Sequence, residues 1–230
     1  MADRSSAASR FLSRLARRAG GGNIEEGDGI TPWPEMDDVL KLQPAHVVCL
    51  GTRSRNREAQ VGYDIAVHAA ANGLHAVLFA PDLTPRNPVP NLTIIQKQRP
   101  TTWYVQEILT RLTDSRTPAD LVVIDRLQLM NTDLDAPVQT AEAADDIGCA
   151  LKQIAMTEAL GLPPILLIAR LERPRRPGTL LDIDDLGIGA NLEYHADTVA
   201  LVDRTEPDEV NVFIAKDRSG PAPRHLTITW

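Results

Sequence analysis

The segment Leu121–Met130, which reads LVVIDRLQLM, decides the fold class of this chain. It opens with four apolar residues, three of which are β-branched, and then reaches an acid at Asp125. A short apolar run of this kind is typical of a strand that is buried on both faces of a sheet. An acid at its end is a common ligand-facing carboxylate in nucleotide-binding α/β proteins, although many buried strands also end in an acid. The segment therefore indicates a buried strand and a candidate site.

Further apolar runs lie on both sides of this segment, and stretches with helical spacing separate most of them. This alternation predicts an α/β fold with a mainly parallel sheet that is covered by helices. Near the end of the chain, three runs follow one another without helices between them, which predicts an antiparallel C-terminal extension. Besides 121–125, the expected strands are 46–51, 75–79, 92–95, 165–168, 198–202, 210–215 and 225–229.

The first 44 residues differ from the rest of the chain. Residues 1–18 contain five arginines and one acid, and a short basic amphipathic helix is expected there. Its apolar residues at helical spacing are Phe11, Leu12, Leu15 and Ala16. Three glycines and an acidic stretch with prolines follow, which predicts a flexible linker. We therefore expect a helix and linker over residues 1–44 and a folded domain over residues 45–230. The helix is either a solvated tail or a docking element for a neighbouring subunit or partner.

The composition restricts the classes of function. The chain has 230 residues, and its 24 basic and 31 acidic residues give a net charge of −7. This balance excludes a generally basic nucleic-acid coat, so contact with nucleic acid would need a local patch. No apolar run approaches the roughly 20 residues of a membrane-spanning helix. The two cysteines are far apart and form no disulfide framework, which indicates a reducing, cytoplasmic compartment.

Several segments together resemble the C-terminal ATPase domain of the replicative hexameric DNA helicases, the DnaB family. Leu121–Met130 is very similar to the Walker B segment of that family, including its Leu-Gln-Leu-Met tail. Further matches follow in the order of the family, namely Leu42–Pro44, Leu171–Arg173, Asp185–Leu186, His195–Asp197 and Lys216–Pro221. The resemblance extends from about residue 40 to residue 230. It implies a RecA-like P-loop NTPase fold.

The resemblance also implies where the phosphate-binding loop lies, and this loop departs from the family. When the segments are aligned from Leu42–Pro44 without gaps, the Gly-Lys-Thr of the family falls on Arg57, Glu58 and Ala59. Glu58 would repel the phosphates that a Lys attracts, and Ala59 lacks the hydroxyl that ligates Mg²⁺. Arg57 obstructs the close backbone approach that Gly permits. The candidate nucleotide-binding loop is therefore degenerate, and it comprises Thr52, Arg53, Ser54, Arg55, Asn56, Arg57, Glu58 and Ala59.

The other positions that match functional residues of the family are mixed. The resemblance places the catalytic Glu on Asp82, the Walker B Asp on Asp125 and the state-sensing Gln on Arg170. Lys216 and Arg218 match the pair that the family presents to the nucleotide of the neighbouring subunit. No catalytic set is expected to be intact, and no metal is expected unless Asp125 holds one. Each position also has a structural alternative, such as a buried hydrogen-bonded acid at Asp125 or a solvated pair at Lys216 and Arg218.

Nucleic-acid binding has one feature against it and one in its favour. The DNA-contact loop of the family falls on Gly187–Ala190, which carries no charge. A basic cluster, Arg173, Arg175 and Arg176, could contact a nucleic-acid backbone, or it could be a solvated loop. The arginines after the first strand could likewise hold another phosphate-bearing ligand at a helix N-terminus.

Three functions stay open on the sequence alone. The first is a pseudo-ATPase that binds itself, a helicase or another partner in a DNA-related process, with no cofactor and no catalysis expected. The second is a divergent helicase ATPase, with ATP and Mg²⁺ held through Asp82, Asp125 and the loop arginines. The third is a nucleic-acid or anion-binding module without catalysis. The changes in the phosphate loop and in the DNA-contact segment favour the first.

Overall fold

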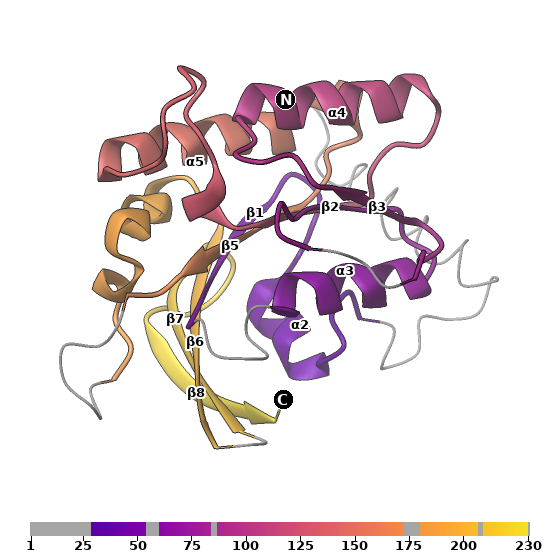
Figure 1. Cartoon of the computed structure of the whole chain (residues 1–230). Helices are drawn as coiled ribbons and strands as arrows, with labels where there is room; N and C mark the ends of the chain where they lie inside the picture. The colour runs from indigo at the N-terminus through magenta and orange to yellow at the C-terminus, as the bar shows by residue number, and fades with distance from the viewer. Residues whose placement is uncertain (1–28, 54–59, 84–86, 173–179, 207–208, 230) are drawn as a thin grey trace.

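An eight-stranded sheet forms the centre of the molecule, with the strand order β3-β2-β4-β5-β1-β6-β7-β8 (Figure 1). This computed structural model describes residues 29–53, 60–83, 87–172, 180–206 and 209–229. The strands are β1 (Val47–Thr52), β2 (Ala76–Phe79), β3 (Leu92–Ile95), β4 (Leu121–Asp125), β5 (Ile165–Arg170), β6 (Thr198–Glu206), β7 (Glu209–Asp217) and β8 (Arg224–Thr229). The helices are α2 (Pro34–Leu40), α3 (Val61–Ala71), α4 (Thr102–Asp114) and α5 (Ala141–Ala155), with the 3₁₀ segments η2 (Leu127–Leu129), η3 (Glu158–Leu160) and η4 (Ile183–Tyr194).

The strand directions confirm the predicted fold class. All pairings among β1 to β6 are parallel, whereas β7 pairs antiparallel with both β6 and β8. β6 joins the two parts of the sheet, because it is parallel to β1 on one side, with Thr52 opposite Val202, and antiparallel to β7 on the other. The chain is thus a mainly parallel α/β protein with an antiparallel C-terminal part.

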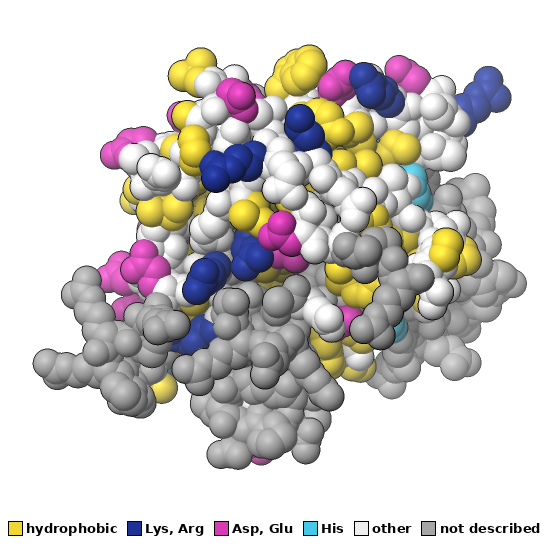
Figure 2. Space-filling model, in the orientation of Figure 1, with side chains coloured by type: hydrophobic (Ala, Val, Ile, Leu, Met, Phe, Trp, Pro, Cys, Tyr) yellow, Lys and Arg dark blue, Asp and Glu magenta, His cyan; other side chains and the backbone are white. Residues whose placement is uncertain are grey.

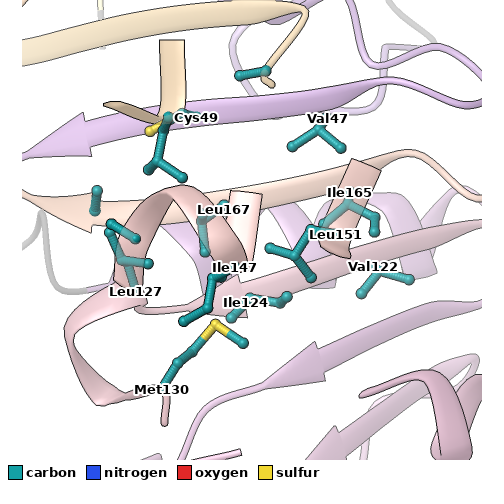
Figure 3. Packing of buried hydrophobic residues seen from close by; sticks show 14 of the residues in the cluster. Val47, Cys49, Val122, Ile124, Leu127, Met130, Ile147, Leu151, Ile165 and Leu167 are labelled. Carbon is teal, nitrogen blue, oxygen red and sulfur yellow. The ribbon is translucent and has the colours of Figure 1, made fainter. Parts of the chain in front are cut away.

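The strands are buried on both faces, because each one sends alternate residues into two hydrophobic clusters. In β4, Val122 and Ile124 join the cluster that α4, α5 and η4 cover, whereas Val123 joins the cluster that α2 and α3 cover. Figure 3 shows Val122 and Ile124 near Ile147 and Leu151 of α5. Full burial of one such side chain stabilises the fold by about 1.5–3 kcal/mol. The apolar runs of the sequence therefore set the layered arrangement in Figure 1.

The helices on the α4–α5 face begin at threonine caps. Thr101 accepts a hydrogen bond from the Tyr104 amide at 3.1 Å, and Thr140 accepts one from the Ala143 amide at 3.2 Å. Each such cap stabilises a helix by about 1 kcal/mol. These caps fix the first residues of α4 and α5.

The packed part of the chain includes residues before the expected boundary at residue 45. α2 occupies part of the expected linker, and its Met36 and Leu40 are buried against the α3 face of the sheet. The Asp37 carboxylate accepts hydrogen bonds from two backbone amides that precede the helix, both at 3.0 Å. Only one face of this short helix is buried, and acids occupy much of the exposed face. The sequence of the stretch therefore resembles that of a linker. The amphipathic helix that we expect over residues 1–18 lies outside the described residues.

Candidate functional site

The parallel strands β1, β2, β4 and β5 end at one edge of the sheet, which we call the carboxyl edge. Asp125 ends β4, Arg170 ends β5, and Asp82 follows β2. Ligands of open α/β sheets bind at this edge. The topology therefore brings together three candidate residues from distant parts of the sequence. Thr52 is buried and ends β1, so the loop after this strand begins one residue later than the sequence predicts.

The first turn of α3 packs against the end of β4. A Cβ at Gly62 would lie 3.6 Å from the Asp125 Cβ and 3.2 Å from Ile168. The glycine therefore allows a close approach between the helix and the strands. The loop 54–59, which precedes this helix, lies outside the described residues, but its C-terminal neighbour α3 begins next to Asp125.

Asp125 is a partly buried acid whose negative charge is only weakly compensated by nearby groups. Burial raises its pKa, the neighbouring Arg126 lowers it, and Asp82 raises it further. Arg126 itself lies 3.9 Å from Asp82. Among the described residues, none donates a hydrogen bond to the Asp125 carboxylate. The charged form of Asp125 is therefore disfavoured in the folded protein.

We predict that Asp125→Asn stabilises the protein at neutral pH. Because the pKa is raised on folding, the charged carboxylate opposes folding above the ordinary Asp pKa of about 3.9, and the amide removes this charge. We expect the melting temperature at pH 7 to rise by about 2–4 °C in scanning calorimetry, which corresponds to roughly 1 kcal/mol. The same change at the exposed Asp38 should shift it by less than about 1 °C. A lower melting temperature for Asp125→Asn would mean that the carboxylate has a stabilising partner.

Arg170 is tied to the segment after β4 through its backbone. Gln128 accepts a hydrogen bond from the Arg170 amide at 3.0 Å and donates one to the Arg170 carbonyl at 3.1 Å. These bonds continue the pairing of β4 with β5 beyond Asp125 opposite Ile168. The Arg170 side chain remains exposed at the carboxyl edge. Nothing in the sequence pattern indicates that a glutamine side chain replaces a strand partner here.

Arg53, the first residue after β1, is engaged by acceptors on three other segments. Its Nε donates to Asp203 at 2.9 Å, its Nη1 donates to the Glu172 carbonyl at 2.6 Å, and its Nη2 lies 3.7 Å from Asp185. Only 11% of the Arg53 side chain is exposed. In this arrangement the guanidinium has little capacity left for a phosphate. The other loop residues, 54–59, lie outside the described residues, so their anion contacts remain predictions.

The expected trans-acting pair lies beside the end of η4. Lys216 Nζ donates to the Glu193 carbonyl, and Arg218 donates to the Tyr194 carbonyl at 3.3 Å. Both carbonyls belong to the last turn of η4, where cations are favourable. Burial lowers the pKa of Lys216, and the nearby Arg218 lowers it further. Lys216 and Arg218 thus have structural contacts within their own chain.

This pair lies far from Asp125 within its own chain. β7, which carries Lys216, is separated from β4 by four strand spacings of about 4.8 Å, or roughly 19 Å across the sheet. Lys216 also lies opposite Val199, near the start of β6, whereas Thr52 lies opposite Val202. Any action of this pair on a nucleotide near Asp125 would therefore have to involve a second subunit.

Asp197 and Lys152 form an ion pair close to Arg218, and no sequence pattern indicates it. Asp197 accepts hydrogen bonds from Lys152 Nζ at 2.6 Å and from the Val47 amide at 2.8 Å, and it lies 3.5 Å from Arg218. Burial acts to raise the pKa of Asp197, but these hydrogen bonds outweigh it and the pKa is lowered. The carboxylate thereby connects α5, the start of β1 and the start of β6.

The segment that matches the DNA-contact loop packs into the domain. Residues 187–190 lie within η4, where Leu186 and Gly189 are buried and Ile188 packs partly against the core. They therefore serve packing, and they present no charged surface. Arg173, Arg175 and Arg176 lie outside the described residues, so their contact with nucleic acid remains a prediction.

The described part of the chain lacks two kinds of feature. None of its His, Cys, Asp and Glu side chains form a group of three or more that could hold a metal ion. None of its helices is long and apolar enough to cross a membrane.

Comparison with known proteins supports the fold. The sequence profile of the DnaB-like helicase C terminal domain matches residues 87–229. No curated protein sequence matches the chain significantly. Among solved structures, one described as an ATPase domain has a TM-score of 0.69 at 18% identity, over 100% of this chain and 96% of that one. A DnaB-like replicative helicase, studied with its interactions with primase, has a TM-score of 0.68 at 16% identity, over 99% of this chain and 74% of that one.

Proposed function

The chain belongs to the family of the DnaB-like helicase C terminal domain, and from this premise we propose that it is a pseudo-ATPase that acts by binding. It is a helicase-family protein with a RecA-like fold. We propose that it associates with itself or with a helicase-type partner in a DNA-related process. The proposal depends on Glu58, the residue on which the ungapped alignment from Leu42–Pro44 places the phosphate-binding lysine of the family.

The side chains expected in the phosphate-binding loop support this proposal. An acid at position 58 would oppose a triphosphate, and an alanine at position 59 offers no hydroxyl to a magnesium ion. Like charges a few ångströms apart cost roughly several kcal/mol in a partly desolvated site. That cost is comparable with much of the binding free energy of a micromolar ligand, about 8 kcal/mol. Arg53 does not offset it, because its charge is engaged by Asp203 and Asp185.

Isothermal titration calorimetry with Mg-ATP tests the proposal. We expect no binding heat up to millimolar nucleotide for the wild-type protein, and the same result for Asp125→Ala. A saturating binding curve in the wild type that disappears in Asp125→Ala would contradict the proposal and favour a divergent ATPase.

We further propose that Lys216 and Arg218 act across a subunit boundary. Their distance from Asp125 within the chain supports a role in trans, and their contacts with the end of η4 hold them in a defined place. Such a protein would complete the site of a neighbouring, nucleotide-binding subunit without binding nucleotide itself.

A hollow between α4 and α5 is the surface that we propose for association. It has a volume of about 260 Å³ and is lined by Trp103, Gln106, Asp133 and Gln153, among others. Trp103 is 64% exposed, and Leu134, next to Asp133, is 92% exposed. Figure 2 shows hydrophobic side chains among acidic and basic ones over the α4–α5 layer, at the top of the view.

The occupant that we propose is the segment 10–18 of a second copy. This segment combines Phe11, Leu12 and Leu15 with four arginines, so its apolar residues match Trp103 and its arginines match Asp133. The segment precedes the described residues and is long enough for a helix of about two turns.

Light scattering coupled to size exclusion at micromolar concentration tests this association. We expect wild-type protein to run as an oligomer and Trp103→Asp to shift it to monomer, because a charge would face the apolar side of the segment. Because Trp103 is largely exposed, we expect this change to cost little packing within the chain. A wild-type monomer would contradict self-association, and an unchanged oligomer in Trp103→Asp would contradict the surface.

A further inference from the structure

We propose that Arg53 is an internal clamp that holds Glu172 and Asp185, the residues on either side of the segment 173–182, to the central strands β1 and β6. The segment 173–182 includes Arg173, Arg175 and Arg176, and the residues on its two sides, Glu172 and Ile183, are described by the structure. At its base the Glu172 amide donates to the Asp185 carbonyl at 2.8 Å. Arg53 contacts both of these residues, through the Glu172 carbonyl and the Asp185 carboxylate. The inference does not depend on whether nucleotide binds.

The third contact fastens this base to the sheet. Arg53 follows β1, and its Nε donates to Asp203 of β6 at 2.9 Å. β1 and β6 are neighbours near the middle of the sheet, so the guanidinium joins Glu172 and Asp185 to two central strands. A planar guanidinium can address three acceptors in different directions at once, which an ammonium group does less well.

The packing around the clamp is close. Gly187 has a φ of +55°, and a Cβ there would lie 2.1 Å from Glu172 Oε1. A Cβ at Gly51 would lie 2.6 Å from Leu171 and 2.9 Å from Leu186. The start of η4 and the end of β5 therefore lie directly against the end of β1, which Arg53 follows in the sequence. Loss of the guanidinium would leave two partly buried carboxylates without their cation.

The clamp gives Arg53 a role that is different from phosphate binding. It couples Arg53, the first residue after β1, to Glu172 and Asp185, through contacts that need no ligand. The contacts of Arg53 with Glu172, Asp185 and Asp203 therefore form in the free protein, and they do not require an anion at the carboxyl edge.

Hydrogen–deuterium exchange of the full-length protein tests the clamp. In Arg53→Ala we expect the amides of residues 183–187 to exchange at least about 10-fold faster than in the wild type, because the contacts that hold them are lost. The melting temperature should fall by about 3–6 °C. Arg53→Lys should restore only part of the protection. The matched control is Arg111→Ala, which removes an exposed arginine from its pair with Glu107 and should leave residues 183–187 unchanged.

The outcomes are distinct. If Arg53→Ala exchanges like the wild type in residues 183–187, or changes no more than Arg111→Ala, the clamp is refuted. If Arg53→Ala does not fold, Asp203→Ala, which removes the acceptor of Arg53 Nε, must raise exchange in the same residues; no local increase would refute the clamp. Binding of Mg-ATP by the wild type would contradict the pseudo-ATPase proposal and leave the clamp standing.

Discussion

Replacement of Asp197 by alanine is expected to lower the free energy of unfolding by about 3 kcal/mol. The Asp197 side chain is only 7% exposed, and its carboxylate compensates the Lys152 ammonium at 2.6 Å. It also satisfies the Val47 amide at 2.8 Å. Alanine would leave the Val47 amide without this acceptor and the Lys152 ammonium with the neutral Ala45 carbonyl at 2.8 Å, so a partly buried charge would lose its counter-charge.

Urea denaturation at pH 7 measures this effect. The control is Asp38→Ala, at an exposed position, which should change the free energy of unfolding by less than about 0.5 kcal/mol. A loss below about 1 kcal/mol for Asp197→Ala would show that solvent replaces the carboxylate and that the ion pair does not hold β1 to α5.

The pH dependence of the same variant has a defined sign. The pKa of Asp197 is lowered in the folded protein, so its contribution is fully present above the ordinary Asp pKa of about 3.9. It is lost as the pH falls below about 4 and through the folded-state pKa. The stability difference between the wild type and Asp197→Ala should therefore be constant near neutral pH and shrink in acid. Asp125 has the opposite sign, because its pKa is raised.

Restoration of the phosphate loop is expected to have the second large effect. We predict that the combined change Arg57→Gly, Glu58→Lys and Ala59→Thr raises the affinity for Mg-ATP at least about 100-fold, or roughly 2.7 kcal/mol. The lysine would replace repulsion by attraction, the threonine would offer a ligand to magnesium, and the glycine would admit the phosphates to the backbone. Asp125, next to the start of α3, would then face a cation.

Calorimetry of this triple variant needs one control. The pair of changes Arg57→Gly and Ala59→Thr, without the change at Glu58, should give no measurable affinity if the acid is the main obstacle. If this double variant binds Mg-ATP, the residues that prevent binding are Arg57 and Ala59, and Glu58 is not the main obstacle. No binding in the triple variant would mean that the rest of the carboxyl edge no longer fits a nucleotide.

The fold could be predicted because its signals are local. Leu121–Asp125 and the other apolar runs carry enough hydrophobic and β-branched residues to specify buried strands, and the family resemblance supplies their order. α2 was missed because its Met36 and Leu40 lie among acids and prolines, and seven residues are too few for a clear periodic pattern. Asp125, Asp82 and Arg170 lie at one edge because parallel strands end on the same side, but their roles there stay predictions.

The side-chain partners could not be predicted in the same way. Arg53 meets Asp203 and Glu172 from segments more than a hundred residues away, and no spacing rule links them. The same holds for Lys152 and Asp197, which are 45 residues apart. Charged pairs of this kind depend on the three-dimensional arrangement, which composition and periodicity do not encode.

The account depends most on the charge at residue 58. Crystals of the protein soaked with a nonhydrolysable ATP analogue and Mg²⁺ test it directly. We predict no electron density for nucleotide between the start of α3 and Asp125. Clear density for a triphosphate seated beside Glu58 would contradict the pseudo-ATPase proposal.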